Sequence, residues 1–436
     1  MLGLFMILPV FALHAEQLHG NTPTLAGLAI GIYGFSQAIC QIPFGFLSDR
    51  YGRKRIIYAG LLIFALGSVV AALASSIWGV ILGRALQGGG AVSAAAMALA
   101  ADLTREEHRI KVMAFIGITI GLSFAVSMVL GPILNGWIGV PGIFWLTGLL
   151  AFIGIVVVRF RVPDPIVSRI HRDAEPVASQ FGRVLSDGQL LRLNFGIFTL
   201  HLLLTATFVA VPLALRDAGL VSDQHWRVYL PALVLSIAVM APFVIIAEKY
   251  RQLKPVFLGA ILALALTEFG LLRLHDTVLE TGVLLLVFFT AFNLLEATLP
   301  SLIAKMAPPD AKGTAMGIYS SSQFLGAFAG GTLGGVLHGR FGLQSVFAFA
   351  ALGALAWLLA AWTMKNPSYL SSRLLNVGAC DEADARHLAW RLTQVQGVAE
   401  AVVIAAEGVA YLKVDRHTLD ETALQKLTLV NAQASS

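Results

Sequence analysis

The sequence predicts an all-α membrane protein with twelve transmembrane helices in two six-helix bundles, followed by a small α+β domain. Two observations predict this class. Of the 436 residues, 57% are hydrophobic and only 13% are charged, whereas a soluble domain carries about 25% charged residues. The apolar residues also gather in successive long runs, which a chain needs when lipid is its outer solvent.

Eleven apolar runs are long enough to cross a hydrocarbon core of about 30 Å. They cover residues 25–46, 56–73, 77–101, 110–134, 142–158, 190–213, 226–246, 256–274, 278–304, 314–338 and 344–364. A twelfth run, Met1–Leu13, is too short for a full crossing, and no charged residues precede it as they would in a signal peptide. We therefore expect the first helix to be truncated in this sequence.

Lysine and arginine residues predict how the helices are oriented. The alternate loops that begin with residues 49–55 contain 18 of them, and the loops on the opposite side contain 4. Because basic loops remain in the cytoplasm, we expect the 49–55 loop and the C-terminus to be cytoplasmic. The long basic loop 159–189 is predicted to link an N-terminal bundle, residues 1–158, to a C-terminal bundle, residues 190–365.

The end of the chain differs in kind from the rest. The net charge is +7 over residues 1–372 and −2 over residues 373–436, which indicates a change of environment. The apolar pattern of residues 373–430 predicts alternating strands and helices. The expected elements are a strand at Leu374–Val377, a helix from Asp381 to about Gln396, a hairpin of Ala401–Ala405 and Val409–Val414, and a helix through Val430. This βαββα order predicts a cytoplasmic ferredoxin-like domain.

Several classes of function are not expected. The two cysteines, Cys40 and Cys380, are far apart, and Ala383 stands where a metal-binding pair would have its second cysteine, so no metal site is predicted. The sequence has no phosphate-binding loop and no nucleophile–base motif, so we expect no enzyme, no cofactor and no nucleotide. The basic residues lie in short loops and not in one patch, which argues against a function in binding nucleic acid. We expect a monomer that interacts with a small-molecule substrate, protons and the lipid bilayer.

Ionisable residues inside apolar runs are candidates for function, because a charge in a membrane is costly. Arg84, His201 and Glu296 each lie within such a run. An imidazole titrates near neutrality and a buried carboxyl group resists ionisation, so either could carry a driving proton. An interhelical hydrogen bond is the alternative for His201 and Glu296, and extension to the membrane surface is the alternative for Arg84. Glu268 is a weaker candidate, because we expect its helix to be peripheral.

Further polar and small residues recur along the predicted helices. The polar ones could line a substrate cavity or form interhelical hydrogen bonds, and both interpretations stay open. They are Tyr33, Gln37, Gln41, Asn293, Tyr319 and Gln323. The small ones permit close approach of helices. In the fifth helix these are Gly121, Gly131 and Gly136, with Pro132.

The loop after the second helix contains the most specific motif, Gly45-x-Leu-Ser-Asp49-Arg50-x-Gly52-Arg53-Lys54-Arg55. It resembles the signature loop of the major facilitator superfamily. Arg84-Ala-Leu-Gln87-Gly88 is similar to that superfamily's next motif. Gly131-Pro132 is similar to the motif of its proton-coupled exporters, from which Ser127 and Asn135 depart. With the small domain, the chain resembles YajR-type inner-membrane transporters.

The resemblance implies the major facilitator fold and proton-coupled efflux of small amphipathic molecules by alternating access. It also implies gating by Asp49, Arg50, Gly52, Arg53, Asp102 and Gly313. Asp49 would contact the start of the eleventh helix, and Arg84 would take part in proton coupling. Two alternatives remain, namely a proton symporter that imports a small solute and a transporter-derived sensor that acts through the C-terminal domain.

Overall fold

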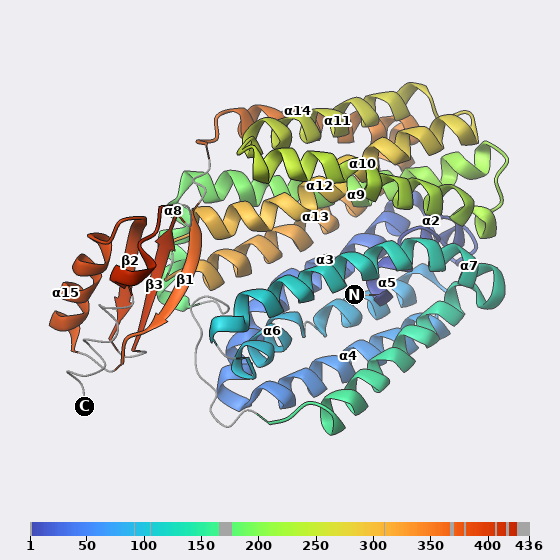
Figure 1. Ribbon diagram of the computed structural model, residues 1–436. Helices are drawn as coiled ribbons and strands as arrows, with labels where there is room; N and C mark the ends of the chain where they lie inside the picture. The colour runs from blue at the N-terminus through green and yellow to red at the C-terminus, as the bar shows by residue number, and fades with distance from the viewer. Residues whose placement is uncertain are drawn as a thin grey trace.

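The computed structural model describes residues 2–90, 92–104, 106–164, 177–308, 310–366, 370–378, 381–405, 408–415 and 418–424. Long helices run side by side through the body of the molecule, and a small domain with a β-sheet lies at one end of them (Figure 1). We call this the domain end of the bundle, and we call the opposite end the far end. Cys380, most of the predicted last helix and the middle of the linker lie outside the described residues.

The helices follow the predicted spans. The N-terminal half contains α1 (Leu2–Phe5), α2 (Phe11–Ala15), α3 (Pro23–Tyr51), α4 (Arg53–Leu73), α5 (Ile77–Gly89), α6 (Ser93–Asp102) and α7 (Glu106–Phe160). The C-terminal half contains α9 (Gly188–Asp217), α10 (Trp226–Lys249), α11 (Leu253–Arg273), α12 (Val278–Met306), α13 (Lys312–Phe341) and α14 (Leu343–Trp362). Each of the eleven full-length apolar runs coincides with one or two of these helices, which confirms the predicted fold class.

Length and hydropathy alone single out fewer spans. Eight of the described helices are long and apolar enough to cross a membrane by these two criteria. One predicted span is divided between α5 and α6, and α7 contains two spans that meet at Gly139, where φ is 65°. The α13 helix is not among the eight, although it is 30 residues long. Its many glycines, which lower its hydropathy, serve helix packing.

Local capping fixes where several spans begin. The Thr22 hydroxyl accepts a hydrogen bond from the Leu25 amide at 3.2 Å at the start of α3. Asp187 caps α9 through the amides of Gln189 and Leu190. Thr277 forms a reciprocal capping box with Glu280 at the start of α12. These side chains satisfy amide groups that a helix leaves free at its first turn.

The α13 helix joins the two halves through close contacts at glycine. A Cβ atom added to Gly335 would lie 2.5 Å from the Pro23 carbonyl oxygen of α3. A Cβ atom added to Gly326 would lie 2.0 Å from the Phe198 carbonyl oxygen of α9. Both distances are shorter than any van der Waals contact, so only glycine permits this backbone approach. The α13 helix therefore packs between α3 of one half and α9 of the other.

The linker between the halves attaches to the C-terminal half at the domain end. It includes the turn η1 (Ala178–Gln180) and the helix α8 (Phe181–Ser186). The Arg183 guanidinium donates to both carboxylate oxygens of Asp310, at 3.1 and 3.0 Å. The Val177 amide donates to the Thr314 hydroxyl at 2.8 Å, near the start of α13.

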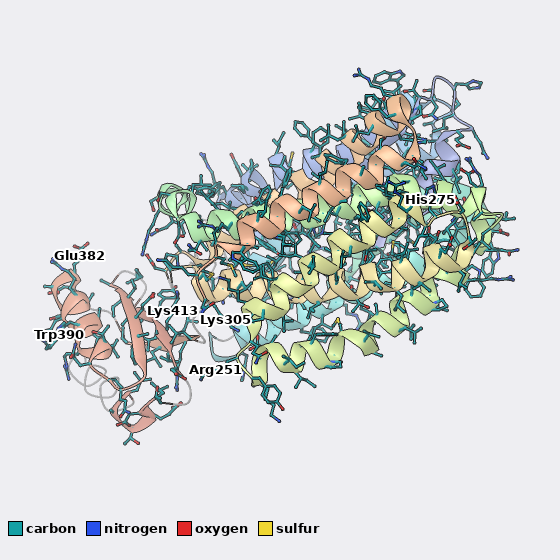
Figure 2. All side chains as sticks on the ribbon, turned by 90° about the horizontal axis from the view of Figure 1, so that it is seen from above. Arg251, His275, Lys305, Glu382, Trp390 and Lys413 are labelled. Atoms are coloured by element: carbon teal, nitrogen blue, oxygen red, sulfur yellow. The ribbon has the colours of Figure 1, made fainter. Side chains whose placement is uncertain are left out.

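The small domain has the predicted order of elements. It consists of β1 (Ser371–Asn376), α15 (Glu382–Thr393), β2 (Val398–Ile404) and β3 (Val409–Val414), and residues 421–424 are helical. The strands form an antiparallel sheet in the order β1-β3-β2, which is the arrangement of a ferredoxin-like domain without its last strand. Leu388 and Leu392 of α15 pack with Leu412 of β3 in its core. Figure 2 shows the sheet beside the domain end, where Arg251 lies 3.8 Å from Asp415.

Candidate functional site

A polar cluster joins three helices in the middle of the C-terminal half. The Gln323 side-chain amide nitrogen of α13 lies 2.8 Å from His201 Nε2 of α9 and 3.5 Å from Glu296 Oε1 of α12. His201 Nε2 lies 4.0 Å from Glu296 Oε2. The sequence predicted two of these residues as proton carriers and the third as a cavity residue. The structure brings all three together, which the sequence could not foresee.

Two side chains of this cluster, His201 and Glu296, can accept and release a proton. With its nitrogen toward the ring, the Gln323 amide can donate only to a His201 Nε2 that carries no proton. If the ring gained a proton at Nε2, it would donate, and the opposite end of the amide would have to turn toward it. Gln323 can therefore match either protonation state of the ring while it remains beside Glu296.

Backbone contacts hold this cluster at its short distances. The Thr205 hydroxyl of α9 lies 2.9 Å from the Ala327 carbonyl oxygen of α13. A Cβ atom added to Gly330 would lie 2.1 Å from the Leu202 carbonyl oxygen. The close approach of α9 and α13 thus sets the position of Gln323 against His201.

Arg84 lies in a second polar cluster, inside the N-terminal half. Its side chain is fully buried, donates to the Gln87 side-chain oxygen at 3.1 Å, and stacks on the Tyr33 ring at 4.9 Å. The Gln87 amide in turn donates to the Ser68 hydroxyl at 2.8 Å. Within the described part of the chain, no carboxylate forms an ion pair with Arg84. Its charge is therefore stabilised by an amide, a backbone carbonyl of Ala29 and an aromatic face.

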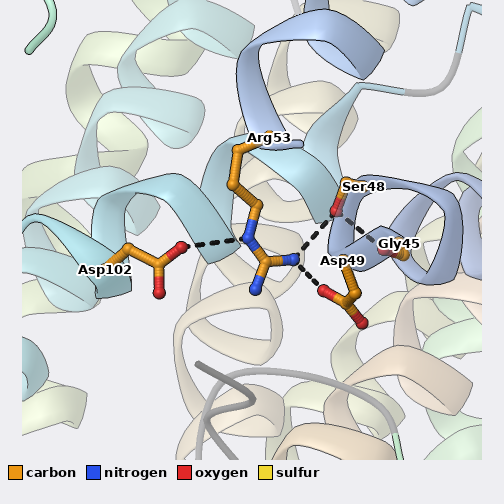
Figure 3. A network of polar contacts seen from close by, with 5 residues as sticks. All are labelled: Gly45, Ser48, Asp49, Arg53 and Asp102. Carbon is orange, nitrogen blue, oxygen red and sulfur yellow. Dashed lines mark hydrogen bonds and ion pairs between the residues drawn. The ribbon is translucent and has the colours of Figure 1, made fainter. Parts of the chain in front are cut away.

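The predicted gating residues form a charge cluster at the domain end. The Arg53 side chain donates to Asp102 at 3.0 Å and to the Ser48 hydroxyl at 2.9 Å, and it also pairs with Asp49 (Figure 3). Gly52 separates α3 from α4 and has a φ of 96°, a conformation that favours glycine. Arg50 is exposed beside this turn, and Gly313 is buried in the first turn of α13. The contact predicted between Asp49 and the start of α13 remains a prediction.

The remaining predicted cavity residues have different environments. Tyr33, Gln37 and Gln41 are all buried along α3. Asn293 donates to the Ser236 hydroxyl of α10 at 3.0 Å, which is an interhelical hydrogen bond. The Tyr319 hydroxyl is buried and has no hydrogen-bond partner within the described residues. A role for these side chains in binding substrate remains a prediction.

The glycines predicted to pack the fifth helix are not equivalent. A Cβ atom added to Gly131 would lie 2.5 Å from the Met6 carbonyl oxygen, and one added to Gly136 would lie 3.0 Å from Asp223. At Gly121 an added Cβ atom would meet no atom of the described structure within 4 Å. Gly131 and its neighbour Pro132 thus pack against the N-terminal segment, while Gly121 is exposed and takes no part in close packing.

Glu268 differs from Glu296 in its surroundings. It is fully buried in α11, and one of its oxygens accepts a hydrogen bond of 2.6 Å from the Thr207 hydroxyl of α9. The exposed fraction of the Glu296 side chain, in contrast, is 33%. Glu268 therefore lies outside the polar cluster. Its replacement by glutamine is the control for the same replacement at Glu296.

Comparisons with known proteins agree with this architecture. The sequence model of the Major Facilitator Superfamily matches residues 1–289 and 193–392. The chain therefore belongs to the major facilitator superfamily of membrane transporters. Its fold is shared with the human organic anion transporter MFSD10 (TETRAN), with a TM-score of 0.62 at 18% identity over 83% of this chain and 95% of that one.

Relatives define its place within the superfamily. The chain is 47% identical to the inner membrane transport protein YajR of Escherichia coli (strain K12), over 95% of this chain and 91% of that protein. It is thus a YajR-type transporter. It is also 26% identical to the multidrug resistance protein MdtH of Aeromonas salmonicida (strain A449), over 77% of this chain and 84% of that protein.

Proposed function

We propose that this chain exports small amphipathic molecules in exchange for protons, by alternating access between its two bundles. The observation that carries this proposal is the cluster of His201, Gln323 and Glu296, in which an amide lies between an imidazole and a carboxyl group. The three residues come from α9, α13 and α12, so a change in the packing of these helices alters the cluster directly.

The Glu296 carboxyl group explains how the two fluxes are linked. A carboxylate attracts a cationic group by its charge, whereas a protonated carboxyl group has no charge with which to do so. A substrate of that kind and a proton therefore compete for the same side chain. Such competition makes the release of one depend on the binding of the other, which is the requirement for exchange. We assign His201 the role of a second proton acceptor, which communicates with Glu296 through Gln323.

The proposed orientation rests on the charge of the loops, and the proposed location and direction of transport rest on the names of relatives. The domain end contains the basic loops with 18 lysine and arginine residues, so we assign it to the cytoplasm. The name of the Escherichia coli relative supports an inner-membrane location. The name of the MdtH relative, a multidrug resistance protein, supports export over import.

The two remaining clusters have supporting roles in this proposal. The group around Arg53 lies at the domain end, where the halves must separate to admit substrate, so we assign it to gating. Asp49 would then contact the start of α13, where unpaired amides favour a negative charge. Arg84 is buried without a carboxylate partner among the described residues, so its charge is available to respond to proton binding elsewhere in the N-terminal half.

Efflux from whole cells tests the proposed direction. Cells that express the native chain should accumulate less of a fluorescent amphipathic cation than cells with the empty vector, and a protonophore should abolish the difference. Glu296→Gln should abolish it as well, because the amide cannot exchange a proton. Greater accumulation in cells with the native chain would indicate import and would contradict the proposal.

A further inference from the structure

We propose that Phe124, Phe289 and Phe292 form a hydrophobic seal between the two bundles, which separates the polar cluster from solution at the far end. The role of the polar cluster and the orientation of the chain are those of the proposed function, on which this inference rests.

The seal is made by both halves of the molecule. Phe124 lies on α7 in the N-terminal half, and its ring centroid is 6.3 Å from that of Phe289 and 5.5 Å from that of Phe292, both on α12. Phe5 of the N-terminal segment supports it from behind at 5.0 Å. All three rings of the seal are at most 6% exposed. Aromatic rings at these distances are in direct contact and leave no room for water between them.

The seal lies on the far side of the polar cluster. The α12 helix begins at the far end, and Phe292 and Phe289 precede Glu296 by one turn and two turns, or about 6 Å and 10 Å along the axis. The Phe292 ring also lies 5.8 Å from the His201 ring. A path from the far end along α12 to the cluster therefore passes these rings.

The rings of the aromatic layer are less exposed than the Glu296 side chain. The Glu296 side chain keeps 33% of its exposed area, whereas Phe292 keeps 3% and Phe289 none. Apolar constrictions of this kind exclude water and the protons that travel with it.

An ion pair joins the two halves at the far end, outside this seal. The Arg216 guanidinium, at the end of α9, donates to both oxygens of Glu16, at 2.8 and 2.7 Å, and so joins the two halves. Both side chains are about half exposed, and an exposed ion pair contributes little free energy. It also offers no barrier to water. Of these two features, the aromatic layer is therefore the one that can exclude water from the far side.

A proton leak measured without substrate tests the seal. Purified protein is reconstituted in liposomes with an imposed pH gradient, and the decay of the gradient is followed with an internal pH dye. Phe124→Ala should raise the leak rate at least about tenfold, equivalent to about 1.4 kcal/mol of barrier. The matched control is Phe115→Ala on the same helix, because Phe115 is 71% exposed and its removal should leave the leak unchanged.

A conservative variant guards against loss of folding. Phe124→Leu retains an apolar side chain of similar bulk but lacks the ring, and it should leak at a rate between those of the native chain and Phe124→Ala. A native leak rate in either variant, with a normal elution volume in size-exclusion chromatography, would overturn the seal. The proposed function fails separately: if Glu296→Gln leaves coupled transport intact while Phe124→Ala leaks, the seal stands and the proton site does not.

Discussion

Replacing Gly330 by alanine should disrupt the contact between α9 and α13 and displace the polar cluster. The added Cβ atom would lie 2.1 Å from the Leu202 carbonyl oxygen and 2.3 Å from the Thr205 hydroxyl. Ordinary contacts need about 3.5 Å, so the helices must separate by about 1 Å. Because Gln323 lies on α13, its 2.8 Å contact with His201 would lengthen beyond hydrogen-bond distance.

The loss of stability caused by Gly330→Ala is measured against a matched control. Overpacking of this kind costs about 1–3 kcal/mol, and the lost Thr205 bond adds about 0.6 kcal/mol. Gly259→Ala is the control, because an added Cβ atom there meets nothing within 4 Å. Both variants gain the same helix propensity, so the difference between them isolates packing.

Thermal unfolding in one detergent is the assay for this comparison. We expect Gly330→Ala to unfold at a clearly lower temperature than Gly259→Ala, and its coupled transport to fall further than its stability alone would require. Equal unfolding temperatures for the two variants would refute the close approach of α9 and α13 on which the site depends.

Three further predictions concern other parts of the chain. Arg53→Met should destabilise the protein, because it removes a guanidinium partner of the buried Asp102; adding Asp102→Asn should recover part of this loss in thermal unfolding, and no recovery would argue against the pair. Pro23→Cys with Gly339→Cys should form a disulfide between the halves under mild oxidation, because the two Cβ positions are 3.4 Å apart and a disulfide needs about 3.8 Å. This bond should stop transport until a reductant is added, and unhindered transport by the oxidised protein would contradict alternating access. A chain without residues 371–436 should still transport in proteoliposomes, and complete loss of transport by a folded truncated protein would favour the sensor alternative.

The fold was predictable because lipid imposes a simple requirement on sequence. A helix that faces hydrocarbon needs a long apolar run, and all eleven long runs are helices in the structure. The small domain was predictable for a different reason, since its strands and helix have distinct periodicities. The α13 helix shows the limit of hydropathy: its glycines lower the average, yet it packs between α3 of one half and α9 of the other.

The site was predictable only residue by residue. His201 and Glu296 were conspicuous because ionisable groups are rare inside apolar runs. Their meeting with Gln323 depends on how α9, α12 and α13 pack, which the glycine contacts decide. Phe124 gave no indication in the sequence, because a phenylalanine in a membrane helix is ordinary. Only its contacts across the two halves distinguish it from Phe115, which faces outward on the same helix.

The most direct test of proton exchange at Glu296 is to measure proton movement by the purified protein in the presence of its substrate. A compound exported from cells is added to proteoliposomes, and the native chain is compared with Glu296→Gln and Glu268→Gln. We expect substrate-evoked proton flux in the native chain and in Glu268→Gln, and none in Glu296→Gln. Flux that survives Glu296→Gln but disappears with Glu268→Gln would contradict this expectation. It would assign the proton to the buried carboxyl group of α11 instead.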